Sequence, residues 1–309
     1  MPAQVRTSGA RTAESASTDW LKDENARTQR SALCCMRAAM KFPIQIVSTD
    51  FDGTFHTDFE DPPVPRVLED LIASLQAKGV TWVINTGRDL SSLMEALGRA
   101  QLSIWPDYVV IVEREIYRRE DSQYVDLETW NTKCKSAHEK VFVQLREDLP
   151  RLVEWIRSRF QATIYEDSYS PFCLIAQNNG HADVIHEYLN DYCRGIPNLA
   201  YVRNDVYARF SHAAYNKGSA LAEIGRRLCV GPDQIVAAGD HLNDLPMLSL
   251  DYARWLIAPR NAVDAVKLTV RRQCGYVSDL PHGYGVADGL EVVLKSLAAD
   301  PVSSEVSGL

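Results

Sequence analysis

The sequence predicts a doubly wound α/β fold, a parallel sheet with helices on both faces, into which a second α+β domain is inserted. First, apolar runs at 44–47, 80–84 and 235–238 each end at a polar loop, as buried parallel strands do. Second, amphipathic helical stretches lie between such runs, which is the β-α-β order of a parallel sheet. Third, residues 89–210 show a mixed, antiparallel-looking pattern, which indicates the inserted domain.

The parallel part begins with a strand that ends at Asp50. Pro65 fits the first turn of a helix that runs to about Lys78, and residues 80–84 form the next strand. Asp89 is suited to cap a helix over residues 90–100, because an aspartate at this position accepts a hydrogen bond from a free backbone N–H group. The later elements of this part are a helix from Lys217 to about Cys229, strands at 235–238 and 254–258, and a terminal helix at 285–299.

The middle segment combines predicted helices at 138–159 and 181–193 with strands at 108–112, 116–119, 124–127, 163–166, 172–177 and 200–210. We therefore expect a core domain made of residues 41–88 and 211–309, and a cap domain of residues 89–210 that sets substrate choice. Residues 1–40 are rich in Ala, Ser, Thr and Arg and have no apolar h-region. We expect them to form a disordered N-terminal extension without a secretory signal.

The composition narrows the classes of function. The net charge of −8 argues against nucleic acid as the main partner, because a phosphate backbone requires a basic surface. No apolar run is long enough for a membrane span. The seven cysteines are odd in number and show no C-x-x-C spacing, which favours reduced thiols in a cytoplasmic protein. The oligomeric state stays open.

Two aspartates stand one residue apart at the end of the first strand. Residues i and i+2 of a strand share a face, so the carboxylates of Asp50 and Asp52 meet in a small volume. Like charges at such distance are unfavourable unless a cation or a proton offsets them. We therefore expect a divalent metal ion at this strand end, with further ligands from elsewhere in the chain.

Polar residues also follow two other predicted strands. These are Thr86 in Thr86-Gly87-Arg88, and Asp240, Asn243 and Asp244 in Gly239-Asp240-His241-Leu242-Asn243-Asp244, while Lys217 opens a helix between them. With Asp50-Phe51-Asp52-Gly53-Thr54, this ordered set resembles the four motifs of the haloacid dehalogenase (HAD) superfamily of phosphatases and phosphotransferases. The long gap between Thr86 and Lys217 is similar to subclass IIB, which includes Cof-type and sucrose-phosphatase-like enzymes.

The resemblance implies a HAD-like Rossmannoid core with a C2-type cap, and a phosphatase that acts on a small phosphorylated metabolite such as a sugar phosphate. It implies that Asp50 attacks phosphorus to form an aspartyl-phosphate and that Asp52 acts as the general acid and base. Thr86, Gly87 and Lys217 would bind the phosphoryl oxygens. The implied cofactor is Mg²⁺, with Asp50, the Asp52 backbone carbonyl, Asp240, Asn243 and Asp244 at the metal site.

Two other functions are compatible with these motifs. A phosphomutase or phosphotransferase would pass the phosphoryl group to a second hydroxyl, and a ligand-binding protein would keep the fold without catalysis. The intact motif residues argue against the latter. Arg88 fits either a structural ion pair or a contact on the phosphate side, and His241 fits a loop position better than a catalytic one.

The substrate is specified less well than the reaction. Trp130, Tyr165, Tyr169 and Phe172 could stack on a sugar face or belong to the cap core. In the turn at 113–115 this chain has Glu-Arg-Glu, where the sucrose-phosphatase-like branch usually has a glycine. The sequence therefore indicates no individual sugar phosphate.

Overall fold

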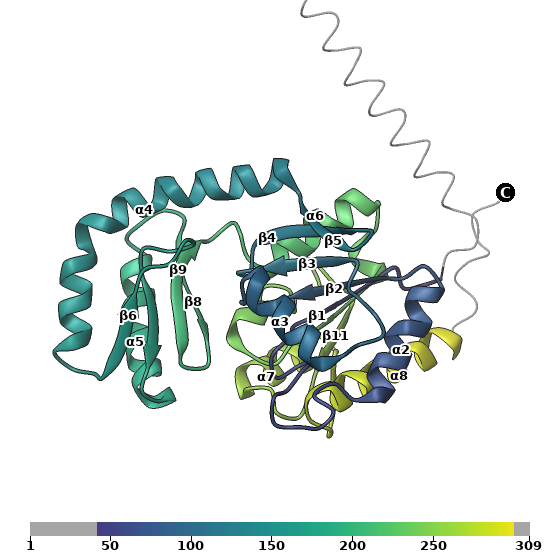
Figure 1. The fold of residues 1–309 in the computed structure, drawn as a ribbon. Coiled ribbons are helices and arrows are strands. Elements are labelled where there is room, and N and C mark those ends of the chain that lie inside the picture. The colour runs from purple at the N-terminus through teal and green to yellow at the C-terminus, as the bar shows by residue number, and fades with distance from the viewer. Residues whose placement is uncertain (1–41, 300–309) are drawn as a thin grey trace, which may run out of the picture. The chain divides into compact units, whose positions relative to one another are not determined.

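The computed structural model describes residues 42–299, so the predicted disordered extension at 1–40 lies outside the described residues. The strands form an eight-stranded sheet and a four-stranded sheet. Figure 1 shows that the two sheets are separate. Within the described residues, no helix is both long and apolar enough to cross a membrane.

The larger sheet has the order β12-β11-β10-β1-β2-β3-β4-β5. Strands β12 to β3 are parallel, and β4 and β5 continue the sheet in antiparallel fashion. The central strand β1 pairs with β10 on one side and β2 on the other, so the three carboxyl ends lie at one edge. The strands are β1 (Ile46–Thr49), β2 (Thr81–Asn85), β3 (Tyr108–Ile111), β4 (Glu115–Glu120), β5 (Gln123–Asp126), β10 (Ile235–Ala238), β11 (Trp255–Ala258) and β12 (Tyr276–Val277).

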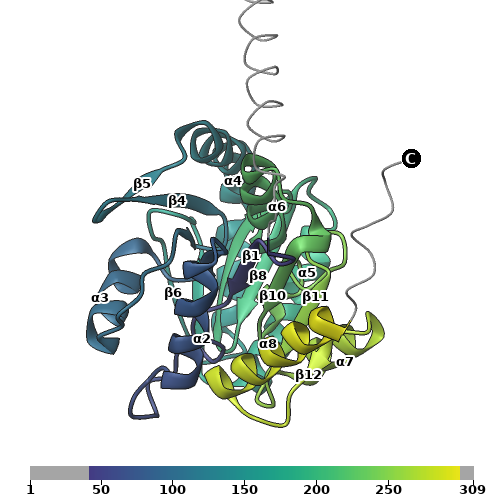
Figure 2. The same ribbon diagram turned by 90° about the vertical axis from the view of Figure 1, so that its right-hand side faces the viewer.

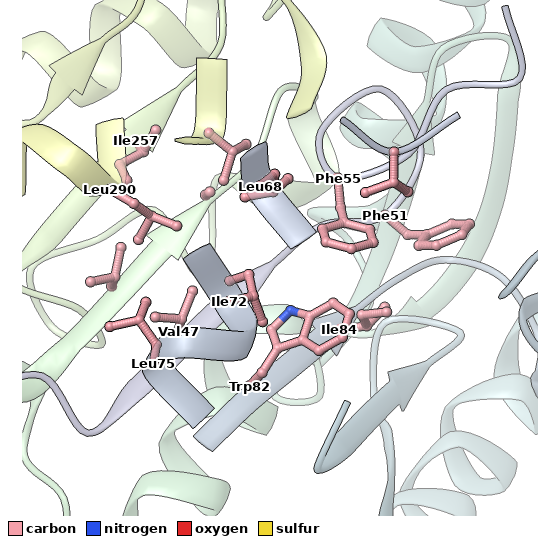
Figure 3. Close-up of a cluster of buried hydrophobic side chains, with 14 of the residues drawn as sticks. Val47, Phe51, Phe55, Leu68, Ile72, Leu75, Trp82, Ile84, Ile257 and Leu290 are labelled. Atoms are coloured by element: carbon pink, nitrogen blue, oxygen red, sulfur yellow. The ribbon is translucent and has the colours of Figure 1, made fainter. Parts of the chain in front are cut away.

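Helices cover both faces of this sheet, as a doubly wound fold requires. One core cluster joins the sheet to α2, α3 and α8, and the other joins it to α6 and α7. Figure 2 shows α2 beside α8. In the first cluster the rings of Trp82 and Phe55 lie 4.8 Å apart, and Figure 3 shows them among buried aliphatic side chains. The helices are α2 (Arg66–Ala77), α3 (Leu90–Ala100), α6 (Lys217–Leu228), α7 (Asp264–Arg272) and α8 (His282–Ala299), with single turns η1 (Pro232–Gln234) and η2 (Leu242–Asp244).

The smaller sheet is antiparallel, in the order β6-β7-β9-β8. Apolar side chains of α4 and α5 cover one of its faces and form a third core cluster. Its elements are α4 (Glu128–Arg157), β6 (Ala162–Tyr165), β7 (Cys173–Ala176), α5 (Asn179–Cys193), β8 (Leu199–Asn204) and β9 (Tyr207–His212). The predicted inserted α+β cap is therefore present.

The cap's boundaries need revision. Strands β3, β4 and β5 hydrogen-bond in the larger sheet, although the sequence pattern places residues 89–126 in the cap. We propose that the cap runs from Glu128 to His212, where the smaller sheet and its two helices begin and end, and that residues 42–127 belong to the core.

Helix α4 begins ten residues before the helix predicted at 138–159, so that prediction is wrong at its start. The first turns of α4 are joined to β4 by a polar contact. The Asn131 side chain accepts the Ile116 N–H at 2.9 Å and donates to the Ile116 carbonyl at 3.0 Å. A segment held by such a contact has no apolar periodicity to indicate a helix. The strand predicted at 200–210 is a hairpin, β8 and β9, and helix α7 and strand β12 were not predicted.

The buried side chain of His138 links α4 to the last residues of β9. Its Nε2 accepts the backbone N–H of His212 at 2.9 Å, so the proton is on Nδ1, which donates to the Cys134 carbonyl at 2.8 Å. Burial, together with the charge of Arg114, lowers the pKa of His138 to about 3. The native state therefore holds this imidazole neutral well below its ordinary pKa.

We expect His138 to make the fold sensitive to acid. Because the unfolded chain binds a proton that the native state excludes, the free energy of unfolding falls as pH drops below about 6.5, by up to about 1.4 kcal/mol per pH unit. Urea unfolding between pH 4.5 and 7 measures this slope. His138→Gln keeps an acceptor but cannot titrate, so its slope should be shallower. Parallel curves for the two proteins would contradict the prediction.

Candidate active site

Three predicted site residues lie together at the carboxyl edge of the larger sheet. Asp50 follows β1, Thr86 follows β2 and Asp240 follows β10. The pairing of Thr49 with both Ala238 and Ile84 brings these strand ends side by side, and the Asp50 N–H donates to the Ala238 carbonyl at 2.9 Å. Ligands bind at this edge in open α/β sheets.

Lys217 lies between two carboxylates at this edge. Its Nζ donates to Asp50 Oδ1 at 2.6 Å and to Asp244 Oδ1 at 2.5 Å, and the side chain is fully buried. Burial acts to lower the pKa of Lys217, but the charges of Asp244 and Asp50 outweigh it and raise that pKa above the ordinary value. Lys217 is therefore a fixed positive charge at the site.

Asp244 contacts both Lys217 and the loop after β10. Its Oδ2 accepts the backbone N–H groups of Asp240 at 2.8 Å and His241 at 2.9 Å, while Oδ1 accepts from Lys217. Both oxygens thus have partners within the protein. The contacts suit Asp244 to orient the lysine and the loop after β10.

The carboxylates of Asp50, Asp240 and Asp244 form an acidic cluster, with one oxygen of each lying within 4.8 Å of the others. Burial, followed by the charge of Asp244, raises the pKa of Asp50 well above its usual range. The same two causes raise the pKa of Asp240 to about 7. Asp50 Oδ2 is buried and has no hydrogen-bond partner among the described residues. Three crowded carboxylates, two of them with raised pKa values, fit a hard divalent cation such as Mg²⁺.

Two neutral groups support Asp240. Thr54 Oγ1 donates to Asp240 Oδ1 at 2.9 Å, and Asn261 Nδ2 contacts Oδ2 at 3.2 Å. Gly53 has φ +77°, and a Cβ there would lie 2.5 Å from Asp240 Oδ2. The glycine in Asp52-Gly53-Thr54 is therefore required both by the turn and by the approach of Asp240.

Asp52 is not part of this cluster and pairs with Arg88. The guanidinium donates from Nε to Asp52 Oδ2 at 2.7 Å and from Nη2 to Oδ1 at 2.6 Å, which is a bidentate ion pair. Of the two interpretations of Arg88, the structure shows the ion pair. The Asp52 side chain is 37% exposed and lines the large cavity described below.

The loop after β2 contributes Thr86 and Gly87. Thr86 is buried, and its Oγ1 accepts the Arg88 N–H at 3.1 Å. A Cβ on Gly87 would lie 3.3 Å from Glu113 Oε1, so the glycine admits the close approach of that carboxylate. Gly87 lines the cavity beside Arg88.

Asn243 lies on the single turn η2, and its Nδ2 donates to Glu113 Oε1 at 3.0 Å. Its Oδ1 is buried without a partner among the described residues. His241 is in position to accept the Asp205 N–H, which lies 3.1 Å from Nε2. Since Asp205 is in the β8–β9 turn, His241 forms a contact between core and cap.

A cavity of about 1030 Å³ lies between the strand ends and the cap. The size suits a small organic ligand. Of the four aromatic residues that could stack on a sugar, Tyr165 lines the cavity. Phe172 is buried in the cap core, Tyr169 packs against the first core cluster, and Trp130 Nε1 donates to the Arg114 carbonyl. The core lines it with Asp52, Gly87, Arg88, Glu113, Asp240 and His241, and the cap adds Tyr165, Arg203, Asn204, Tyr207 and Arg209.

Sequence reasoning missed Glu113 and Asn261 as site residues. Both follow the carboxyl end of a strand, β3 for Glu113 and β11 for Asn261, which is where the predicted residues also lie. That position was the available signal. The sequence alone does not reveal these two residues, because the hairpin at 108–126 resembles part of the cap and the loop at 259–263 matches none of the four motifs.

The chain is similar in sequence to known proteins over most of its length. The family model described as haloacid dehalogenase-like hydrolase matches residues 114–288, more than half of the chain. The chain is 26% identical over 267 residues to the 5-amino-6-(5-phospho-D-ribitylamino)uracil phosphatase YcsE of Bacillus subtilis, covering 80% of this chain and 94% of that protein.

Solved structures show the same fold. The sucrose-phosphatase of Synechocystis sp. PCC6803, in complex with sucrose and phosphate, superposes with a TM-score of 0.60 at 19% identity, covering 82% of this chain and 98% of that one. A Plasmodium vivax protein described as a HAD/COF-like hydrolase superposes with a TM-score of 0.59 at 19% identity, covering 82% of this chain and 96% of that one. The fold is consistent with the resemblance to subclass IIB. The chain belongs to the haloacid dehalogenase-like hydrolases, as a phosphoric monoester hydrolase of that family.

Proposed function

We propose that the protein is a Mg²⁺-dependent phosphatase that hydrolyses a small phosphorylated metabolite, a sugar phosphate, through an aspartyl-phosphate on Asp50. The observation that carries this proposal is the buried, unpartnered Asp50 Oδ2 beside the charge of Lys217. A nucleophilic oxygen without a hydrogen bond is free to attack, and the adjacent ammonium offsets the charge of an approaching phosphate.

In the first step, Asp50 Oδ2 forms a bond to phosphorus while the ester P–O bond breaks, and Asp52 gives a proton to the leaving alkoxide. In the second, Asp52 takes a proton from water, the water oxygen bonds to phosphorus, and the bond to Asp50 breaks to release inorganic phosphate. Before the first step Asp52 must leave the ion pair with Arg88 and take a proton from solvent, and the second step restores that proton. Thr86, Gly87 and Lys217 hold the phosphoryl oxygens throughout.

The metal site follows from the acidic cluster. Asp50, Asp240 and the Asp52 backbone carbonyl would hold Mg²⁺, and Asn243 and Asp244 would complete or orient its ligand shell. When bound, Mg²⁺ supplies positive charge that offsets the phosphate dianion.

The sugar phosphate assignment rests on the cavity and on the relatives. Asn204, Tyr207 and Arg209 offer the cavity hydrogen-bonding groups that suit a hydroxyl-rich ligand. YcsE is named for a phosphoribityl substrate, and the Synechocystis structure holds sucrose and phosphate. We also propose a cytoplasmic location, since the five cysteines within residues 42–299 are free thiols.

We expect purified protein to release inorganic phosphate from at least one member of a panel of phosphorylated sugars and related metabolites, detected with malachite green. Removing metal with EDTA should reduce the rate at least about 100-fold, because the phosphate charge and the acidic cluster would then lack their cation. Added Mg²⁺ should restore it, and EDTA presaturated with Mg²⁺ should have no effect. Phosphate released in smaller amount than substrate consumed would favour a transferase over a hydrolase.

A further inference from the structure

The hairpin turn between β3 and β4 has an unusual backbone. Val112 and Glu113 are its two central residues, with φ +43° and +68°, and the Arg114 N–H donates to the Ile111 carbonyl at 3.0 Å. Two-residue turns with both central residues in the left-handed region favour asparagine and glycine. A β-branched residue followed by glutamate is strained there. Glu113 thus stands where glycine would fit more easily.

Backbone contacts hold this turn against the loop after β2. The Val112 N–H donates to the Arg88 carbonyl at 2.9 Å, and the Glu113 N–H donates to the Thr86 carbonyl at 2.8 Å. Strained residues that persist through such external contacts cluster at functional sites. The strained backbone therefore favours a functional role for the Glu113 side chain.

The Glu113 carboxylate lies among the groups proposed to bind phosphate. Its Oε1 accepts from Asn243 Nδ2 at 3.0 Å and lies so near Gly87 that a Cβ there would be 3.3 Å away. Glu113 is 7% exposed and lines the cavity. Its charge also acts on Lys217, where it adds to those of Asp244 and Asp50. Gly87 and Lys217 are two of the three residues to which the proposed function assigns the phosphoryl oxygens. Glu113 thus places an anion in an anion-binding site.

We propose that Glu113 is an intramolecular competitor for the phosphoryl position: its carboxylate occupies that position in the free enzyme and disfavours retention of inorganic phosphate. This inference rests on the proposed function. A carboxylate and a phosphate dianion repel strongly in a partly buried site, so phosphate binds only when the Glu113 side chain turns away from Gly87. Return of the side chain would then hasten product release.

The test is the affinity for inorganic phosphate, measured by calorimetry in Mg²⁺ buffer. Glu113→Gln keeps the size and the acceptor for Asn243 but removes the charge, and Glu113→Gly also removes the left-handed strain. We expect the dissociation constant for phosphate to fall at least about 10-fold in both variants, equivalent to about 1.4 kcal/mol. The constant for product inhibition in steady-state assays should fall in parallel.

Asp121→Gly is the matched control. Asp121 also has a positive φ, +53°, in the exposed β4–β5 turn, so the variant relieves the same backbone strain away from the cavity. It should raise the melting temperature, as Glu113→Gly should, and leave phosphate affinity unchanged. Unchanged or weaker phosphate binding in Glu113→Gln would overturn the competitor role, as would a gain in Asp121→Gly.

The two proposals fail in different ways. If the wild-type protein hydrolyses esters of the panel but neither Glu113 variant binds phosphate more tightly, the competitor role is wrong and the phosphatase proposal stands. If the variants bind phosphate more tightly while the wild type hydrolyses nothing, the competitor role stands and the phosphatase proposal is wrong.

Discussion

Asp50→Asn should reduce phosphate release at least about 10³-fold, because an amide cannot form the aspartyl-phosphate while the remaining site groups supply only residual catalysis. Asparagine has nearly the same shape, and Lys217 keeps its contact with Asp244. The measurement is the initial rate at saturating substrate with Mg²⁺ present. Full activity in this variant would contradict the proposed mechanism.

The Asp50→Asn variant also tests whether Asp50 contributes to the stability of the fold. Burial and the charge of Asp244 raise the pKa of Asp50, so the ionised carboxylate destabilises the metal-free native state at pH values above the ordinary aspartate pKa. Replacing it with a neutral amide should keep or raise the melting temperature in EDTA at pH 8. A large fall in melting temperature together with lost activity would point instead to a structural role.

Lys217→Met should destabilise the metal-free protein by about 3–5 kcal/mol, because removing one partner of a buried ion pair leaves charge uncompensated. Here the loss would leave Asp50 and Asp244 facing each other without the ammonium between them. Urea unfolding at pH 8 gives the free energy. The variant should also lose activity, since the phosphoryl oxygens would lack their positive partner.

Two further variants test whether the loss of stability in Lys217→Met comes from the uncompensated charges. Lys217→Met combined with Asp244→Asn should recover part of the loss, because one of the two stranded charges is gone. Lys140→Met on the exposed part of α4 should change stability by less than about 0.5 kcal/mol. A loss in Lys217→Met no larger than in Lys140→Met would show that the buried lysine contributes little.

The elements of the parallel sheet could be predicted well because their sequence pattern has a single physical cause. Strands β1, β2 and β10 are almost entirely buried, so their sequences are mainly apolar, and each is followed by polar residues of the site. Asp89 accepts the Ser92 N–H at 2.8 Å, as expected for its helix. Local rules were sufficient for these elements.

The prediction from sequence failed for elements whose sheet or boundary is set by tertiary contacts. The hairpin at 108–126 has local strand character, but its membership of the larger sheet depends on pairing between β3 and β2, which no local pattern reveals. The start of α4 depends on the contact between Asn131 and Ile116. In both cases polar or long-range contacts override the hydrophobic period.

The same contrast between local patterns and long-range contacts applies to the site residues. The motifs pointed to Asp50, Lys217 and Asp240, which the structure brings to one edge of the sheet. They could not show that Asp52 pairs with Arg88, because that depends on two side-chain conformations across different loops. Nor could they show Glu113, whose approach is set by a strained turn.

The pairing of β1 with β10 also affects how the chain folds during synthesis. Thr49 and Ala238 are neighbours in the sheet but stand about 190 positions apart in the sequence. At roughly 5–20 residues per second, the ribosome needs about 10–40 s to make the chain between them. During that time the central strand has one unpaired edge, which exposes backbone groups to other chains. The order of the strands along the chain therefore leaves this edge of β1 open to pairing with other chains until β10 has been made.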